Sequence, residues 1–385
     1  MRIVLLRSNP VNPYPRLEKT ANCLLKNGYS VHVLAWDRSC KYNEKMTKLE
    51  LSNGDVPITR FGIPSSYGAG IKKNLFPLIK FQFELLKWLI NNRTSYDVIH
   101  AYDFDTGYVS LVIARLFRKK IVYDIPDYYV DSHNLKNTAL GSMIEKKEHN
   151  IINKADAVII CTEERKNQIK GTYPKKLVII HNAPKKSISY TKHQKTFEIN
   201  RSEKIKIVYV GILDESRLLK EMADVINSKS NCELHIAGFG QLEEYFINLA
   251  KDNNRINYYG KVLYTDTLYM ENQCDIITAI YDPSIPNHKY AAPNKFYEAL
   301  MLGKPLIMVQ NTGMDKYVSE YDLGEVIEYS KEGFEKGLNR LINRKEEWDD
   351  ISKKSKALYN KEFSWEEMER RIINLYQYIG NGDYK

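Results

Sequence analysis

Short apolar runs alternate along this chain with segments that have the periodicity of amphipathic helices, and this alternation constrains the fold more than any other feature. In the first half the runs lie at residues 3–6, 31–35, 97–100, 121–124, 157–161 and 176–180, and helices are expected between them at 16–27, 108–117 and 144–153. Runs this short and apolar are typical of strands buried on both faces. Strands that alternate with helices predict a parallel sheet covered by helices on both sides.

The alternation stops at a polar stretch and then begins again. Residues 186–204 have no apolar periodicity, so we expect a linker there, and apolar runs at 205–211, 233–238, 275–279 and 305–309 predict a second sheet. The sequence therefore predicts an α/β protein with two doubly wound, Rossmann-like domains, residues 1–185 and 205–362, followed by a final segment at 363–385. Because such sheets bind ligands at the carboxyl ends of their strands, we expect the site in a cleft between the two domains.

Hydrophobicity and cysteine spacing exclude several classes of protein. The 385 residues are 43% hydrophobic and 27% charged, which is typical of globular chains. No apolar run reaches the ~20 residues of a membrane-spanning helix, and the four apolar residues before Arg7 are too few for a signal peptide. The five cysteines all lie more than four residues apart, which favours reduced packing side chains over disulfides or zinc ligands. We therefore expect a cytoplasmic protein.

Charge is distributed unevenly between the two halves. Residues 1–185 hold 29 Lys and Arg against 17 Asp and Glu, whereas residues 186–385 hold 28 against 31. A basic half is typical of proteins that bind nucleic acid, an anionic membrane surface or an anionic substrate. The chain has no zinc-finger spacing, basic zipper region or aromatic RNA-binding motif, so we expect no nucleic-acid partner.

The segment at residues 71–93 allows two interpretations. It combines a broad apolar face with lysines and one arginine, against a single acid, Glu84. A helix of this kind can lie in the interface of an anionic membrane, on its inner face in a cytoplasmic protein. The alternative, which we favour slightly, is an ordinary core helix whose lysines are solvated. The basic residues of the segment are Lys72, Lys73, Lys80, Lys87 and Arg93.

The most informative stretch for chemistry is residues 291–309. Pro293 suits the start of a helix, and Gly303 with Pro305 suits its end, so we expect a helix over 294–302. Its first N–H groups, at Asn294, Lys295 and Phe296, would form an anion site to which Lys295 adds a full charge. Glu298, one turn further on, could accept hydrogen bonds from ribose hydroxyls. The alternative is an ordinary capped helix with Glu298 in solvent.

Two glycine turns and one acidic motif add weaker signals. Gly211 and Arg217 lie between an expected strand and helix, where backbone and guanidinium could meet a diphosphate. Gly238 and Gly240 also follow a strand, but the fuller G-x-G-x-x-G motif is absent because position 243 is Glu. The motif at 103–105, D-x-D, is expected to cap a helix or contact a substrate rather than hold a metal. We predict no metal site.

In their order along the chain, these motifs resemble those of the group-1 (family 4) retaining glycosyltransferases of the GT-B fold. The match at 293–300 with 303–305 is the strongest, and the segment at 363–365 resembles the start of a final helix that returns to the first domain. The other matching segments are 97–101, 123–124, 181–184, 210–213 and 236–240.

The resemblance implies a fold, a reaction and roles for particular residues. It implies two facing Rossmann-like domains and transfer of a sugar from a UDP- or GDP-linked donor, with no cofactor and no essential metal. The acceptor would be lipid-linked or a saccharide, in the synthesis of a cell-surface polysaccharide or glycolipid. Glu298 would hold the ribose, and Arg217 with Lys295 would neutralise the leaving diphosphate. Gly211, Gly238, Asn294 and Phe296 complete the expected donor site.

Three departures from the family's pattern keep other functions open. Tyr290 stands where the family usually has a sugar-contacting Glu, Pro126 where it often has His, and Leu218 begins the pair that replaces the common Lys-Gly. Asp127 remains as the candidate contact to the sugar or acceptor in the first domain, so the expected catalytic residues are Asp127, Arg217 and Lys295. A nucleotide-sugar epimerase of the same architecture and a non-catalytic partner subunit are the alternatives.

Overall fold

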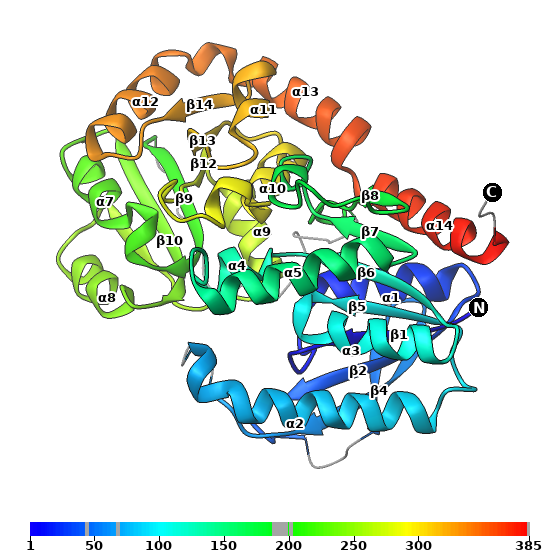
Figure 1. The fold of residues 1–385 in the computed structure, drawn as a ribbon. Helices are drawn as coiled ribbons and strands as arrows, with labels where there is room; N and C mark the ends of the chain where they lie inside the picture. Colours follow the sequence, from blue (N-terminus) through cyan, green and yellow to red (C-terminus); the bar gives the residue numbers. More distant parts are fainter. Residues whose placement is uncertain (43–45, 67–69, 187–198, 200–202, 383–385) are drawn as a thin grey trace. The chain divides into compact units, whose positions relative to one another are not determined.

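The computed structural model describes residues 1–42, 46–66, 70–186, 199 and 203–382, and the chain divides into two compact units (Figure 1). The first unit contains Met1–His181 together with Met368–Lys385, and the second contains Asn182–Glu367. Most of the predicted linker at 186–204 lies outside the described residues. In each unit a sheet with helices on both faces confirms the predicted α/β fold class.

The first unit is built on an eight-stranded sheet in the order β3-β4-β2-β1-β5-β6-β7-β8. Every strand predicted in this half is present, and all of them pair in parallel. The strands are β1 (Arg2–Arg7), β2 (Ser30–Asp37), β3 (Met46–Leu51), β4 (Gly54–Gly62), β5 (Val98–Tyr102), β6 (Lys120–Ile125), β7 (Ala157–Ile160) and β8 (Leu177–Ile179).

One hairpin departs from the predicted parallel arrangement. Strand β3 pairs antiparallel with β4 at the sheet edge, and neither strand was predicted. Along β3 the residues alternate between exposed and half-buried, and the strand contains Thr47, Lys48 and Glu50. Strands at a sheet edge with one wet face lack the continuous apolar run that identified the buried strands.

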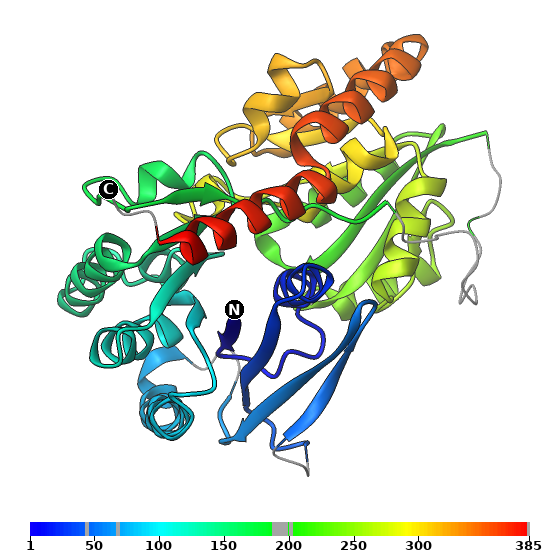
Figure 2. The ribbon, with the colours of Figure 1, turned by 90° about the vertical axis from the view of Figure 1, so that its right-hand side faces the viewer.

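Helices cover both faces of the first sheet. Helices α2, α3 and α5 lie on one face, and α1 with the C-terminal helix α14 lies on the other (Figures 1 and 2). The buried core includes Trp36, Phe81, Tyr96 and Tyr123. The helices around this sheet are α1 (Pro15–Lys26), α2 (Gly70–Asn91), α3 (Asp103–Leu116), α4 (Tyr129–Ser132), α5 (Ala139–Lys154), α6 (Arg165–Gln168) and α14 (Trp365–Asn381).

The second unit is built on a six-stranded, fully parallel sheet in the order β11-β10-β9-β12-β13-β14. All four strands predicted in this half are present, whereas the short outer strands β11 and β14 were not predicted. The strands are β9 (Ile205–Leu213), β10 (Cys232–Gly240), β11 (Ile256–Tyr258), β12 (Ile276–Ala279), β13 (Leu306–Val309) and β14 (Gly324–Ile327).

The helices of the second unit include α10 (Asn294–Leu302), whose bounds are those predicted from Pro293 and Gly303. Gly303 is left-handed, with φ of 72°, which a glycine adopts without steric cost. The other helical elements are η1 (Glu215–Arg217), α7 (Leu219–Asn227), α8 (Glu243–Lys251), α9 (Tyr264–Gln273), η2 (His288–Tyr290), α11 (Asp315–Glu320), α12 (Lys331–Asn343), η3 (Lys345–Glu347), α13 (Trp348–Leu358) and η4 (Tyr359–Phe363).

Two further predictions concern cysteines and membrane spans. None of the five cysteines, all of which lie within the described ranges, forms a disulfide; four of them are buried, while Cys40 is exposed. Within the described part of the chain, none of the helices combines the length and the hydrophobicity that a bilayer crossing requires.

Candidate functional site

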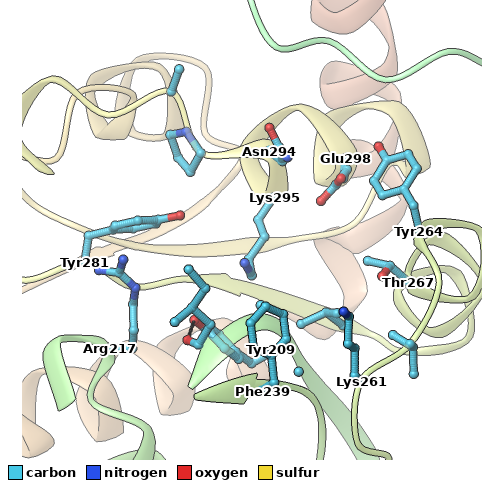
Figure 3. Close-up of a pocket in the computed structure, with 17 residues that line it drawn as sticks. Tyr209, Arg217, Phe239, Lys261, Tyr264, Thr267, Tyr281, Asn294, Lys295 and Glu298 are labelled. Carbon is cyan, nitrogen blue, oxygen red and sulfur yellow. Dashed lines mark hydrogen bonds between the residues drawn. The ribbon is translucent and has the colours of Figure 1, made fainter. Parts of the chain in front are cut away.

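A cavity of about 450 Å³ lies in the second unit, where β9 and β10 end and α10 begins (Figure 3). This is the position in which parallel sheets bind ligands, because the helix N-termini and the strand ends meet there. The lining residues are Tyr209, Val210, Gly211, Ile212, Arg217, Gly238, Phe239, Lys261, Val262, Tyr264, Thr267, Tyr281, Ala292, Pro293, Asn294, Lys295 and Glu298.

The end of β9 and the start of α10 approach each other closely in this cavity. A Cβ added to Gly238 would overlap the carbonyl oxygen of Gly211, so β9 and β10 can end side by side only with glycine at position 238. A Cβ on Gly211 would lie 2.9 Å from the Lys295 ammonium. Gly238 therefore lets the two strand ends meet, and Gly211 leaves room for Lys295.

Lys295 occupies the middle of the cavity (Figure 3). Its Nζ lies 4.6 Å from the ring centroid of Tyr209, and the residue is buried. Burial alone would lower the pKa of Lys295, but the neighbouring tyrosines Tyr209 and Tyr281 and the carboxyl of Glu298 raise it above its usual range. The ammonium is therefore a permanent positive charge at the start of α10.

Arg217 supplies a second cation at one end of the cavity. Its guanidinium carbon lies 4.1 Å from the ring centroid of Tyr281, in a cation–π contact. The η1 turn that carries Arg217 is held by Asp214, whose Oδ1 accepts from the Ser216 N–H at 2.9 Å. A turn that is closed by its own side chains keeps the position of Arg217 defined.

Glu298 provides the carboxyl group of the site. It is only 2% exposed, so it is not the solvated side chain of the alternative interpretation. The hydroxyl of Tyr264 and the buried carboxyl of Glu271 both interact with it. Burial and the charge of Glu298 raise the pKa of Glu271 well above its usual range, which favours the protonated form of Glu271.

A third cation, Lys261, lies at the end of the cavity opposite Arg217 (Figure 3). Its Nζ is 5.1 Å from the ring centroid of Phe239. Three cations, one carboxylate and several aromatic side chains therefore surround the cavity. This set fits a ligand that combines an anionic group with hydroxyls and a flat ring.

Most of the predicted donor-site residues line this one cavity. They are Gly211, Arg217, Gly238, Asn294, Lys295 and Glu298. Phe296 is a correction, because its side chain is fully buried in the core and its N–H donates to the Pro293 carbonyl at 3.0 Å. It therefore does not offer the free N–H group that we expected for anion binding.

Several lining residues were not predicted from the sequence. Three are tyrosines: Tyr209 directly precedes the motif at 210–213, and Tyr264 and Tyr281 lie outside every motif. Because 28 tyrosines are spread along the chain, residue type gave no signal for them. Lys261 follows Gly260, two residues beyond the end of β11, and this glycine was the available signal for it.

Asp127 lies in the first unit and is not among the residues of this cavity. It follows β6, and its Oδ1 accepts from a guanidinium nitrogen of Arg165 at 3.0 Å. The Arg165 side chain is buried, whereas that of Asp127 is 55% exposed. The carboxylate is thus held at the carboxyl edge of the first sheet with most of its surface open.

The acidic motif at 103–105 does not cap a helix as expected. Helix α3 begins at Asp103, its N-cap residue is Tyr102, and no side chain caps it. Asp103 instead forms an ion pair with Arg7 on β1, and Asp105 is buried. Across the part of the chain that the structure describes, no group of three or more His, Cys, Asp or Glu side chains is arranged to hold a metal ion.

Solved structures with the same fold include enzymes of more than one class. A sucrose-phosphate synthase from Thermosynechococcus elongatus matches with a TM-score of 0.78 and 14% identity over 100% of both chains. HepE from Anabaena, solved in complex with UDP-glucose, matches with a TM-score of 0.69 and 13% identity over 98% of this chain and 99% of its own. A putative UDP-N-acetylglucosamine 2-epimerase from Listeria monocytogenes matches with a TM-score of 0.61 and 13% identity over 100% and 98%. At these identities the likeness establishes the fold.

Matches to sequence families identify the chain more narrowly than the fold does. No curated protein matches the sequence. The family described as Glycosyltransferase Family 4 matches residues 16–183, and the family described as Glycosyl transferases group 1 matches residues 191–358. Since one family covers most of each unit, the chain belongs to the group-1 (family 4) glycosyltransferases of the GT-B fold.

Proposed function

We propose that this glycosyltransferase uses a nucleotide-sugar donor, UDP- or GDP-linked, and binds it in the cavity of the second unit. The observation that carries the proposal is the arrangement of Arg217, Lys295 and Glu298 around one space. Two permanent cations suit a diphosphate, and a buried carboxylate suits two ribose hydroxyls. The Anabaena protein HepE, which has the same fold, was solved with UDP-glucose, which makes UDP the first nucleotide to test.

The order of the lining residues implies an orientation for the donor. Lys295 lies between Arg217 at one end and Lys261 with Tyr264 at the other (Figure 3). With the ribose at Glu298, the base would lie toward Tyr264 and Lys261, and the diphosphate would lie at Lys295 and Arg217. The sugar would then project beyond Arg217, toward Tyr281.

In the proposed reaction the acceptor hydroxyl oxygen bonds to the anomeric carbon as the bond from that carbon to the diphosphate breaks, and the hydroxyl proton passes to an oxygen of the leaving diphosphate. Negative charge grows on the leaving diphosphate, and Arg217 and Lys295 stabilise it there. Neither charge depends on a metal, and we propose that the reaction is metal-independent and keeps the anomeric configuration. Asp127 in the first unit is the proposed contact to the sugar or the acceptor.

The surface of α2 supports a lipid-linked acceptor and peripheral contact with an anionic membrane, at the inner face in a cytoplasmic protein. One face of this helix is buried, through Phe81, Leu85 and Leu89. A second face is exposed although it is apolar, with Phe76 77% and Phe83 63% exposed. Exposed lysines lie next to it, at positions 73, 80 and 87. An exposed apolar strip beside a row of lysines is typical of helices that lie in a membrane interface.

The proposal is tested by thermal shift with a panel of UDP-, GDP- and dTDP-sugars. A donor that binds the folded protein raises its melting temperature, since binding adds to stability by mass action. Glu298→Ala and Arg217→Ala should each weaken donor use by more than about tenfold, as expected when a charge-assisted hydrogen bond is lost. Kinetics unchanged in both variants would defeat the assignment of the site.

Two alternative functions predict other outcomes of the same assays. An epimerase would convert the donor sugar with no acceptor present. A non-catalytic partner subunit would bind the nucleotide without transfer or hydrolysis. Product analysis with donor alone, and then with donor and acceptor lipid, distinguishes these from a transferase.

A further inference from the structure

We infer that His288 is a positioning residue that holds the Arg217 guanidinium in place for the donor diphosphate. The inference rests on the proposed function, because it assigns a second residue to the same diphosphate end of the cavity. His288 belongs to η2, between β12 and α10, two residues before Tyr290, and none of the sequence motifs assigned a role to it.

The hydrogen bonds of the imidazole define which nitrogen carries the proton. Nδ1 of His288 lies 2.9 Å from the backbone carbonyl oxygen of Asp282. A carbonyl oxygen only accepts, so this contact assigns the proton to Nδ1. Nε2 then presents a lone pair, and the NH1 group of Arg217 donates to it at 3.1 Å.

Two other groups restrict the same guanidinium. The ring of Tyr281 lies beneath it, and the Ser216 hydroxyl oxygen accepts from NH1 at 3.2 Å. The rings of Tyr281 and His288 meet edge to face, with centroids 5.2 Å apart. His288 therefore fixes both the guanidinium and the aromatic ring on which it stacks.

The chemical advantage of a histidine here is that it orients Arg217 without neutralising it. Among the described residues, no carboxylate lies within ion-pair distance of Arg217. The charge of Asp214 acts on Arg217 from the same turn, and the acids whose charges act on His288 are Asp282 and Asp214. A Glu or Asp at position 288 would hold the guanidinium equally well but would cancel the charge that a diphosphate needs. A neutral imidazole leaves that charge available.

The surroundings keep the imidazole neutral. Burial and the charge of Arg217 lower the pKa of His288, and the Asp282 carbonyl and the charges of Asp282 and Asp214 oppose this only in part. The lone pair on Nε2 is therefore present at neutral pH. At neutral pH, Nε2 of His288 therefore accepts a hydrogen bond that Arg217 donates.

The test compares two substitutions at position 288 in UDP binding, measured by titration calorimetry. His288→Gln can place its carbonyl oxygen toward Arg217 and its NH₂ group toward the Asp282 carbonyl. His288→Phe keeps the ring packing but provides no acceptor. We expect His288→Phe to weaken UDP binding about tenfold, the value of one hydrogen bond to a charged group, and His288→Gln to restore it to within about threefold.

A double-substitution cycle separates positioning from a general structural effect. In an Arg217→Ala background, His288→Phe should weaken UDP binding no further, because the residue it positions is already absent. Equal losses in His288→Phe and His288→Gln, or losses that add to those of Arg217→Ala, would overturn the inference. If the wild-type chain binds no nucleoside diphosphate at all, the proposed function itself fails. Tight wild-type binding that His288→Phe leaves unchanged overturns only the role of His288.

Discussion

Two buried carboxyl groups, Glu271 and Glu298, share one environment and yet have different expected roles. Both interact beneath the cavity, where two negative charges would repel each other strongly. Since Glu271 is fully buried and its pKa is raised well above the usual range, it keeps its proton. Glu298 then carries the charge at the cavity wall, which is where ribose hydroxyls would need an acceptor.

This difference leads to opposite expectations for two isosteric substitutions. Glu271→Gln replaces one neutral group by another, so UDP affinity should stay within about twofold of the wild-type value. Glu298→Gln removes the charge, so affinity should fall by more than about tenfold, as for a lost charge-assisted bond. Titration calorimetry with UDP measures both. A loss for Glu271→Gln as large as that for Glu298→Gln would contradict the assignment of the charge.

Glu148 in the first unit makes stability depend on pH. It is fully buried on α5, it accepts a hydrogen bond from the Tyr123 hydroxyl at 2.7 Å, and burial raises its pKa to about 8. A carboxyl whose pKa is raised by folding contributes stability that is fully present below its unfolded pKa and is lost as pH rises through the folded value. For Glu148 that window runs from about pH 4.5 to about pH 8.

A glutamine at position 148 does not titrate, so Glu148→Gln should lose less stability than the wild type as the pH rises through this window. The free energy of unfolding of the variant, relative to wild type, should increase from pH 5 to pH 8 by a few kcal/mol at most, since one pKa unit corresponds to about 1.4 kcal/mol. Urea unfolding at several pH values measures the difference. Glu50→Gln, at an exposed position on β3 of the same unit, is the control, because the charge of Glu50 is not among those that shift the pKa of Glu148. A difference that does not change with pH would show that Glu148 titrates normally.

At the scale of elements, α2 is the helix whose environment differs most from what its sequence suggested. Both interpretations of residues 71–93 treated the apolar side chains as one face. In the structure they form two, because Phe81, Leu85 and Leu89 pack on the sheet while Phe76 and Phe83 point outward. Gln82 donates to the backbone carbonyl of Asp105, so this side of α2 faces α3. The exposed strip with Phe76 and Phe83 does not face α3.

Membrane contact through this strip can be measured by vesicle sedimentation. The triple variant Lys73→Gln, Lys80→Gln and Lys87→Gln should bind vesicles with 30% anionic lipid at least about tenfold less, since each lysine near such a surface contributes about 1 kcal/mol. Phe76→Ser with Phe83→Ser should also reduce binding, because the apolar contact is lost.

The control for the lysine variant changes three exposed lysines of the second unit, Lys336, Lys353 and Lys356, to Gln. This control removes the same net charge from α12 and α13. Equal binding by all variants would leave α2 as a core helix with an exposed apolar face. Equal losses in the lysine variant and its control would indicate a net-charge effect.

At the scale of the whole molecule, the end of the chain belongs to the unit in which the chain begins. Residues from Met368 onward return to the first unit. There the hydroxyl oxygen of Tyr376 on α14 lies 2.7 Å from Nδ1 of His100 on β5. His100 and Tyr376 are both fully buried, and Lys26 of α1 pairs with Glu369. The first unit therefore depends on residues that follow the entire second unit in sequence.

Tyr376→Ala should destabilise the first unit specifically. It removes a fully buried aromatic ring and leaves His100 without this partner, and such truncations cost about 3–5 kcal/mol. Limited proteolysis should then cut the first unit faster, while UDP still protects the second. Gln377→Ala, an exposed neighbour on the same helix, is the control and should leave both rates unchanged. Unchanged proteolysis of Tyr376→Ala would mean that the first unit is stable without α14.

Features that arise from neighbouring residues could be predicted without the structure. Apolar runs located the central strands, and Pro293 with Gly303 located both ends of α10, because helix limits and buried strands depend on local backbone preferences and on the burial of consecutive side chains. Lys295 and Glu298 could be assigned to a site from their positions in that one helix.

Contacts between residues that are distant in the sequence became known only from the folded chain. The contact of His288 with Arg217, the pairing of Asp127 with Arg165 and the burial of Glu271 against Glu298 join segments that carry no motif for one another. The N–H of Phe296, which we expected to be free for an anion, donates instead to the Pro293 carbonyl, and the motif alone did not show this hydrogen bond. Electrostatic interactions act through space, so the charge state of a site emerges only after the chain has brought its groups together.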